Sequence, residues 1–253
     1  IDFCTFLENR SFPLVFGKNP GKEGVLRLGG IQKMTLLDFP GRVACTVFTA
    51  GCNFRCPFCH NASLVTHLCE DTLDTDEFFA FLDRRRGLLE GVAVTGGEPF
   101  AQPDIVDFFR EIRARGYAVK ADTNGSYPDR LRAAVSEGLL DYVAMDIKNS
   151  PPKYAVTAGL PEMPEEVRES AAFLLGGTLP FEFRTTVVDE LHEPADFSLI
   201  GEWLAGRENF FLQPFTDSGD LIGEGLHPPK PEKMHACLAA LREKIPTAEL
   251  RGM

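Results

Sequence analysis

The sequence predicts an α/β protein built as a partial (β/α)6 barrel, and two observations carry this prediction. From Val43 onward, short β-branched or aromatic runs alternate with longer segments whose apolar residues follow helical spacing. This is the pattern of repeated βα units around a parallel sheet. Six units are fewer than the eight that close a full barrel, so we expect the sheet to curl without closing.

The expected strands are short runs of β-branched and aromatic residues. They cover residues 43–48, 92–95, 118–122, 142–147, 181–188 and 210–214. Several of the expected helices begin at a proline or just after an acidic or threonine residue, which favours a helix N-terminus. They cover residues 75–86, 103–115, 128–137, 165–175, 194–205 and 231–244.

The beginning of the chain has a different character. Residues 1–24 contain two prolines and three glycines, so we expect a lead-in of uncertain order. These residues show no basic stretch followed by an apolar run, so a secretory signal is not expected. We expect residues 25–253 to form one catalytic domain, because 253 residues are enough for a single well-filled α/β domain.

Charge and cysteine content narrow the class of protein. The 37 acidic residues outnumber the 26 basic ones, giving a formal net charge of -11, which repels phosphate backbones and anionic membranes. We therefore expect neither a nucleic-acid partner nor a membrane partner, and no segment approaches membrane-spanning length. Seven cysteines with one tight cluster fit a reduced, cytoplasmic protein better than a disulfide framework.

The cysteine cluster is the strongest chemical signal. Residues 51–61 read Gly-Cys-Asn-Phe-Arg-Cys-Pro-Phe-Cys-His-Asn, which places thiols at Cys52, Cys56 and Cys59. A 4Fe-4S cluster normally takes four cysteines, so three would leave one iron open, as in a catalytic metal site. A zinc site is the alternative, but it needs a fourth ligand, and His60 adjoins Cys59 and would point away. A non-catalytic electron carrier would instead predict four cysteines.

Three polar strings follow later strands, at the edge where the loops of a parallel barrel meet. Taken singly, each has a plain structural alternative: a glycine turn, an Asx turn or a solvated lysine. The strings are Gly-Gly-Glu-Pro at 96–99, Asp-Thr-Asn-Gly at 122–125 and Asp-Ile-Lys at 146–148. Arg184 lies within the fifth strand, where it needs either an anionic ligand or a plain ion pair.

The spacing Cys-x3-Cys-x2-Cys with Phe58 before the third cysteine resembles the radical S-adenosylmethionine superfamily. The continuation through His60 and Asn61 resembles the activating enzymes of glycyl radical enzymes. The resemblance implies one 4Fe-4S cluster on Cys52, Cys56 and Cys59, with S-adenosylmethionine at the open iron. It also implies that Phe58 meets the adenine, and that the methionine amino group meets Gly96, Gly97 and Glu98.

The two aspartate strings resemble pyruvate formate-lyase activating enzyme. This resemblance implies a monovalent-cation site formed by Asp122, Thr123 and Asp146, whose oxygen ligands suit such an ion. It implies that Lys148 pairs with the methionyl carboxylate, and that Asn124 lies on the cofactor side. Independently of the resemblance, the need of Arg184 for a partner makes it a further candidate for cofactor binding. No catalytic side chain beyond the cluster and the cofactor is expected, because radical chemistry requires no acid-base pair.

The implied reaction is that of an oxidoreductase that works under anaerobic conditions. Reductive cleavage of S-adenosylmethionine gives a 5'-deoxyadenosyl radical, which takes a hydrogen from a backbone glycine of a partner enzyme. A low-potential donor such as flavodoxin or ferredoxin would supply the electron. Only Cys69 lies between His60 and Thr95, so we expect no second cluster.

The identity of the partner rests on finer resemblances. Residues 30–41 and the strand and cysteine loop that follow resemble an anaerobic ribonucleoside-triphosphate reductase activating protein, and the resemblance covers residues 28–253. Pyruvate formate-lyase is the second choice, because the strand-end strings serve both, but Thr216 stands where its activating enzyme has a histidine. Other peptide-modifying or small-molecule radical enzymes come third.

Overall fold

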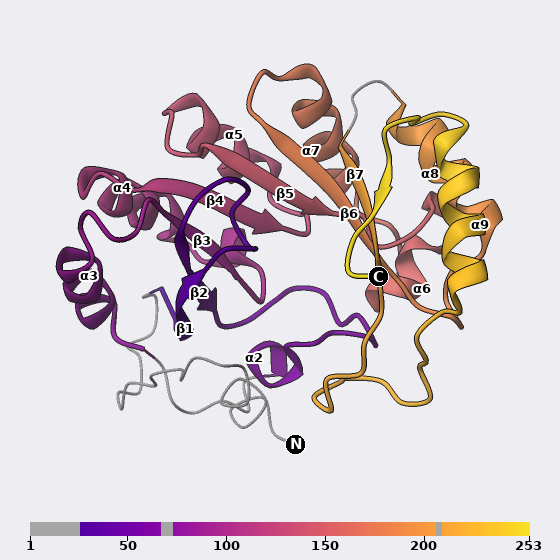
Figure 1. Ribbon diagram of the computed structural model, residues 1–253, viewed down its shortest axis with the longest axis horizontal. Helices are drawn as coiled ribbons and strands as arrows, with labels where there is room; N and C mark the ends of the chain where they lie inside the picture. Colours follow the sequence, from indigo (N-terminus) through magenta and orange to yellow (C-terminus); the bar gives the residue numbers. More distant parts are fainter. Residues whose placement is uncertain (1–25, 67–72, 206–208) are drawn as a thin grey trace. The chain divides into compact units, whose positions relative to one another are not determined.

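The computed structural model describes residues 26–66, 73–205 and 209–253 (Figure 1). The expected lead-in, residues 1–24, lies outside this range, as does Cys69. Within the described chain, no helix has the length and apolar character needed to cross a bilayer.

The eight described strands follow one another in the sheet in chain order, from β1 to β8. The first pair is antiparallel, and the pairings β2 to β3, β3 to β4, β6 to β7 and β7 to β8 are parallel. Among the described strands, β1 and β8 are the two edges, so hydrogen bonds do not close the sheet. The predicted open α/β fold with a mostly parallel sheet is confirmed.

The strand bounds agree closely with the six expected runs, which correspond to β2 to β7. The strands are β1 (Leu28–Thr35), β2 (Ala44–Thr49), β3 (Gly91–Gly96), β4 (Ala118–Thr123), β5 (Tyr142–Asp146), β6 (Phe181–Val187), β7 (Phe210–Pro214) and β8 (Glu249–Leu250). The sequence did not predict β1, which carries two glycines and lies antiparallel to β2, nor the two-residue β8.

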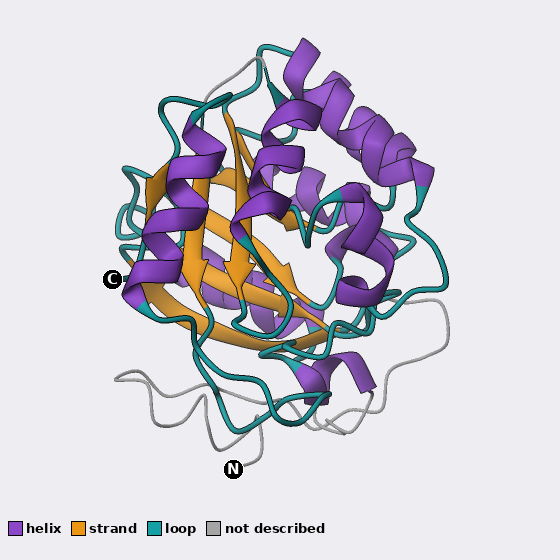
Figure 2. Ribbon diagram, turned by 90° about the vertical axis from the view of Figure 1, so that its right-hand side faces the viewer, coloured by secondary structure: helices purple, strands orange, loops and turns teal. Residues whose placement is uncertain are grey.

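All six expected helices are present, with ends shifted by a few residues (Figure 2). The helices are α2 (Ala62–Thr66), α3 (Thr75–Arg84), α4 (Ile105–Ala114), α5 (Pro128–Ser136), α6 (Tyr154–Ala158), α7 (Glu165–Gly176), α8 (Pro194–Leu204) and α9 (Pro231–Arg242), with 3-10 turns η1 (Pro99–Ala101) and η2 (Pro151–Lys153). The unexpected α2 and α6 have five residues each, which is too short for a helical period to show in the sequence.

Local caps explain two of the firm helix starts. Asp74 precedes α3 and accepts hydrogen bonds from the backbone N–H groups of Asp76 and Glu77, at 2.7 and 3.3 Å. At α8, Glu193 and Asp196 form a reciprocal capping box, which satisfies backbone donors that the first helical turn leaves unpaired.

The chain divides into two compact units, and the expected catalytic domain, residues 25–253, includes both. Among the described residues, the first unit combines 26–53, 61–66, 73–123 and 129–143, and the second combines 54–60, 124–128, 144–205 and 209–253. In the first unit, one face of the sheet is apolar and fully buried at Val47, Val94 and Ala121. The opposite face carries Thr46, Ala93 and Lys120 in one row across β2, β3 and β4. The residue types along each strand therefore separate an apolar face from a small and polar one.

Candidate functional site

In the first unit, the glycine-rich loop after β3 is hydrogen-bonded to the start of the cysteine loop. The backbone N–H of Gly97 donates to the carbonyl of Thr49 at 2.8 Å, and the N–H of Glu98 donates to the carbonyl of Gly51 at 2.8 Å. These bonds hold Glu98 beside the segment that leads into Cys52.

The glycines of this loop are required by the close approach of the two backbones. A Cβ added at Gly97 would lie 1.9 Å from the carbonyl oxygen of Gly51, and Gly96 has a φ of +115°, which favours glycine. The side chain of Asn61 donates to the carbonyl of Gly96 at 2.8 Å. The sequence predicted glycines for close approach to a ligand, and the structure adds that they let one loop pack on the other. Asn61 therefore helps to hold the glycine loop against the cysteine loop.

Glu98 is 1 % exposed, so its carboxylate needs internal partners. Its Oε1 accepts from the backbone N–H of Phe100 at 3.0 Å and from the hydroxyl of Thr123 at 2.8 Å. Thr123, expected as a cation ligand, is therefore a hydrogen-bond donor to the carboxylate expected at the cofactor amino group.

Asp122 has a partner that the sequence did not predict. The ammonium of Lys120, two residues earlier on the same face of β4, donates to its carboxylate. The Lys120 side chain is 2 % exposed and that of Asp122 14 %. Strand alternation puts residues i and i+2 on one face of a sheet. The Lys120–Asp122 pair could therefore have been predicted from the sequence.

In the second unit, α6 supports the remainder of the cysteine loop. The N–H of Arg55 donates to the carbonyl of Ala158 at 3.0 Å, and the Cys56 sulfur lies 3.8 Å from the same oxygen. The N–H of Cys59 donates to the carbonyl of Cys56 at 3.0 Å, which closes a turn between the two thiols. Gly159, with a φ of +67°, lets the backbone pass: a Cβ there would lie 2.2 Å from the Arg55 oxygen.

The three motif cysteines form no disulfide and differ in exposure. Cys56 is buried, whereas Cys52 and Cys59 are half-buried. Burial raises the pKa of the Cys56 thiol to about 11, and the nearby Lys148 ammonium offsets part of that rise. A metal or cluster takes the thiolate form, so loading this thiol releases its proton.

A charge cluster of three side chains lies at the ends of β5 and β6 in the second unit. The Asp146 carboxylate accepts from the Lys148 ammonium at 3.1 Å and from the Arg184 guanidinium at 3.0 Å. Burial raises the pKa of Asp146, but Arg184 and Lys148 outweigh it and hold that pKa at about 2. Two cations around one carboxylate leave a net positive charge, which suits an anionic ligand. Arg184 was expected to need either an anionic ligand or an ion-pair partner, and Asp146 is one such ion-pair partner.

His192 contacts the backbone of Lys148, a member of this charge cluster, and was not predicted as a site residue. It is fully buried, and its Nδ1 accepts from the N–H of Val188 at 3.1 Å, so its Nε2 carries the proton and donates to the carbonyl of Lys148 at 2.8 Å. Burial lowers the pKa of His192 and keeps the ring neutral. The buried Phe58 ring packs edge-on against the His192 ring, with 6.5 Å between the two ring centroids.

Asn124 forms a local turn. Its Oδ1 accepts from the N–H of Ser126 at 2.9 Å and from the Ser126 hydroxyl at 2.5 Å, which is the Asx turn that the sequence left open. Gly125 follows with a φ of +78°. The loop after β4 is therefore structured by its own side chains.

The two halves of the cysteine motif fall in different units, Cys52 in the first and Cys56 and Cys59 in the second. Within the described residues, no three His, Cys, Asp or Glu side chains form a site for a single metal ion. A 4Fe-4S cluster takes one thiolate at each of several irons, so its ligands need not converge on one point.

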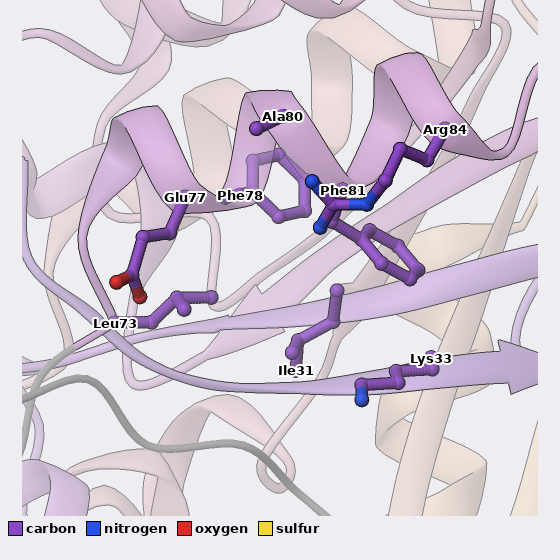
Figure 3. Close-up of a pocket in the computed structure, with 8 residues that line it drawn as sticks. All are labelled: Ile31, Lys33, Leu73, Glu77, Phe78, Ala80, Phe81 and Arg84. Carbon is purple, nitrogen blue, oxygen red and sulfur yellow. The ribbon is translucent and has the colours of Figure 1, made fainter.

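A separate pocket lies between β1 and α3 in the first unit and contains none of the predicted site residues (Figure 3). Its volume is about 360 Å³. Most of the side chains that line the pocket are apolar, and three are charged. The lining residues are Ile31, Lys33, Leu73, Glu77, Phe78, Ala80, Phe81 and Arg84.

Comparison with protein families decides the class. The model of the Radical SAM superfamily matches residues 46–186, more than half of the chain, from β2 through the cysteine loop to β6. The chain belongs to the radical SAM superfamily. It is therefore a radical SAM enzyme, and membership implies a 4Fe-4S cluster and S-adenosylmethionine. This favours iron-sulfur over the zinc alternative.

Sequence relatives include activating enzymes. A Methanocaldococcus jannaschii protein, provisionally named as a glycyl-radical enzyme activating enzyme, is 27% identical over 197 residues, covering 74% of this chain and 79% of the relative. The pyruvate formate-lyase-activating enzyme of Listeria monocytogenes is 26% identical over 198 residues, covering 72% and 77%. A 7-carboxy-7-deazaguanine synthase of Methanopyrus kandleri is 27% identical over 201 residues, covering 71% and 76%.

Solved structures agree on the fold. A radical SAM methyltransferase from Sphaerobacter thermophilus aligns with a TM-score of 0.66 at 18% identity, covering 98% of this chain and 80% of that one. This likeness supports the radical SAM fold and says nothing of the substrate.

Proposed function

We propose that this protein is an activating enzyme that cleaves S-adenosylmethionine reductively and installs a glycyl radical on a partner enzyme. The observation that carries the proposal is the cysteine loop itself, with three thiols and the Gly-Gly-Glu loop hydrogen-bonded to its first residues. The family match and the activating-enzyme relatives support it.

The soft thiolates of Cys52, Cys56 and Cys59 would hold the cluster. When bound, the cluster supplies the electron that breaks a carbon-sulfur bond of S-adenosylmethionine and yields a 5'-deoxyadenosyl radical. The chain itself contributes the α6 support behind Cys56, which excludes water from that thiol.

Charged side chains at the strand ends suit the charged groups of the methionine moiety. The net positive charge at Lys148 and Arg184 suits the methionyl carboxylate, and the buried carboxylate of Glu98 suits the amino group. Gly96 and Gly97 would supply backbone contacts. Phe58 would meet the adenine, and Asn124 would lie on the cofactor side.

Among glycyl radical enzymes, we rank anaerobic ribonucleoside-triphosphate reductase first as the partner. The resemblance at residues 30–41 supports this choice, and the structure gives that segment a strand, β1, and an exposed loop at Leu36 and Leu37. Pyruvate formate-lyase ranks second, supported by the Listeria relative. The electron donor would be a flavodoxin or ferredoxin, in the cytoplasm.

A second candidate function is modification of a small molecule. The Methanopyrus relative, a 7-carboxy-7-deazaguanine synthase, matches this chain over a similar length and at the same identity as the Methanocaldococcus protein. The two functions share reductive cleavage of S-adenosylmethionine and differ in what the radical attacks.

The test uses the full chain, reconstituted anaerobically with iron and sulfide and reduced with dithionite. Incubation with S-adenosylmethionine and each candidate glycyl radical protein should give 5'-deoxyadenosine and a glycyl signal by electron paramagnetic resonance. A partner whose radical-site glycine is replaced by alanine is the control and should give no glycyl signal. Cleavage without a glycyl signal from any candidate would favour the small-molecule function, and absence of 5'-deoxyadenosine would reject both.

A further inference from the structure

Both predicted carboxylate ligands of the monovalent cation already have cationic partners within the chain. The carboxylate of Asp122 accepts from the ammonium of Lys120, and that of Asp146 accepts from Lys148 and Arg184. The hydroxyl of Thr123 donates to Glu98. A potassium or sodium ion at Asp122 would be the second positive charge on a carboxylate that one ammonium already neutralises, so these residues do not fit the implied ion.

Lys120 is built into the sheet. It sits in the middle of β4, in register with Ala93 on β3, and Ala93 is in turn in register with Thr46 on β2. The Lys120 side chain is 2 % exposed. A lysine is almost never fully buried unless it is paired, so the strand has been arranged around this ion pair.

We infer that the Lys120 ammonium takes the place of the monovalent cation at Asp122. An ammonium carries the same charge as a potassium ion and has a similar radius, and it is attached to the strand that also carries Asp122. The inference deepens the proposed function, because it describes the same site. It predicts an enzyme that does not require potassium or sodium.

The first measurement needs no catalysis. The thermal unfolding midpoint of the full chain is recorded in potassium chloride and in choline chloride, both at about 0.1 M so that ionic screening is equal. The wild-type midpoint should be the same in both salts. Lys120→Met removes the ammonium that pairs with the Asp122 carboxylate, so potassium should raise the midpoint of this variant by about 3 °C or more over choline.

Three further variants sharpen this comparison. Lys120→Gln, which keeps a hydrogen-bond donor but loses the charge, should also gain the potassium response. The double variant K120M/D122N removes both charges and should lose it. Lys153→Met is the matched control, because it also removes an ammonium from a buried carboxylate, that of Asp196. Asp196 is not a predicted cation ligand and still accepts from the Ser150 hydroxyl and the Glu193 N–H, so this variant should gain no potassium response.

The second measurement is formation of 5'-deoxyadenosine by the reconstituted, reduced enzyme. The wild-type rate should agree within about twofold between the two salts, and that of K120M should be at least about tenfold higher in potassium than in choline. A wild type that makes no 5'-deoxyadenosine in either salt would refute the proposed function, while the unfolding data would still decide the role of Lys120.

A wild-type midpoint or rate that rises with potassium would overturn the inference. Folded K120M and K120Q proteins without a potassium response would overturn it as well. So would variants that stay unfolded in both salts, because potassium should restore the missing charge. Variants that fold only in potassium would support it.

Discussion

The strand-end clusters of the two units carry opposite net charge. In the first unit, Lys120 pairs with Asp122, and Glu98 is a second, buried carboxylate. In the second unit, Lys148 and Arg184 surround the single carboxylate of Asp146 and leave an excess positive charge. The comparison teaches that the acidic residues of the first cluster favour a cationic group, whereas the basic residues of the second favour an anionic one. Substitutions in the cysteine motif and in each of the two clusters test this difference in charge.

The largest effect is expected at the cysteine motif. Cys56→Ser removes one of the three proposed cluster ligands, so the reconstituted protein should lose its cluster absorbance and at least about 100-fold of its cleavage rate, which corresponds to about 3 kcal/mol. Visible absorption and 5'-deoxyadenosine formation report both. Cys237→Ala is the control, since Cys237 is buried in α9 outside the motif, and it should keep the cluster. A C56S protein with an intact cluster would contradict the ligand assignment.

The next effect concerns the glycine loop of the first unit. Gly97→Ala places a Cβ on the carbonyl of Gly51, so the two loops must separate, and we expect a loss of about 1–3 kcal/mol in the free energy of unfolding. Urea denaturation measures it. Gly176→Ala, where no atom lies within 4 Å of the added Cβ, should cost nothing or stabilise the protein slightly. Equal stability of the two variants would contradict the close approach of the loops.

The positive cluster of the second unit should act on cofactor affinity. Lys148→Met removes the proposed charged partner of the methionyl carboxylate, so the KM for S-adenosylmethionine should rise by about 10- to 100-fold, as expected for one charged hydrogen bond. Steady-state 5'-deoxyadenosine formation measures it. An unchanged KM would place the carboxylate elsewhere.

The smallest effect belongs to His192. Burial lowers its folded pKa below 6.5, so the unfolded chain binds a proton more readily below that pH. Stability is therefore full above about pH 6.5 and falls as the pH drops, by at most about 1.4 kcal/mol per pH unit. Denaturation at about pH 7.5 and pH 5.5 should show a smaller difference for His192→Gln than for wild type. The same difference in both proteins would reject a buried neutral histidine.

The sequence predicted the parts of this molecule that repeat a strong local pattern. The alternation of apolar strands and helices placed β2 to β7 and six helices, and the three-cysteine spacing indicated the family that the comparisons confirmed. These features depend on neighbouring residues, so they can be read from the chain itself.

Features that depend on distant partners could not be read in this way. The role of α6 depends on a bond between Arg55 and Ala158, about 100 residues apart in the chain, and that of His192 on the carbonyl of Lys148. The sequence of β1 shows no clear alternation of apolar and polar residues, and this segment is a strand because it pairs with β2. Lys120 is the exception, because its i, i+2 relation to Asp122 on a predicted strand was visible in the sequence.

The central claim is that a radical made from S-adenosylmethionine takes a hydrogen from a glycine of a partner protein. The most direct test uses anaerobic ribonucleoside-triphosphate reductase in which glycine carries deuterium at its α-carbon. Reaction with the reduced enzyme should give 5'-deoxyadenosine that contains one deuterium by mass spectrometry. Unlabelled 5'-deoxyadenosine, with this partner and with labelled pyruvate formate-lyase, would contradict the account.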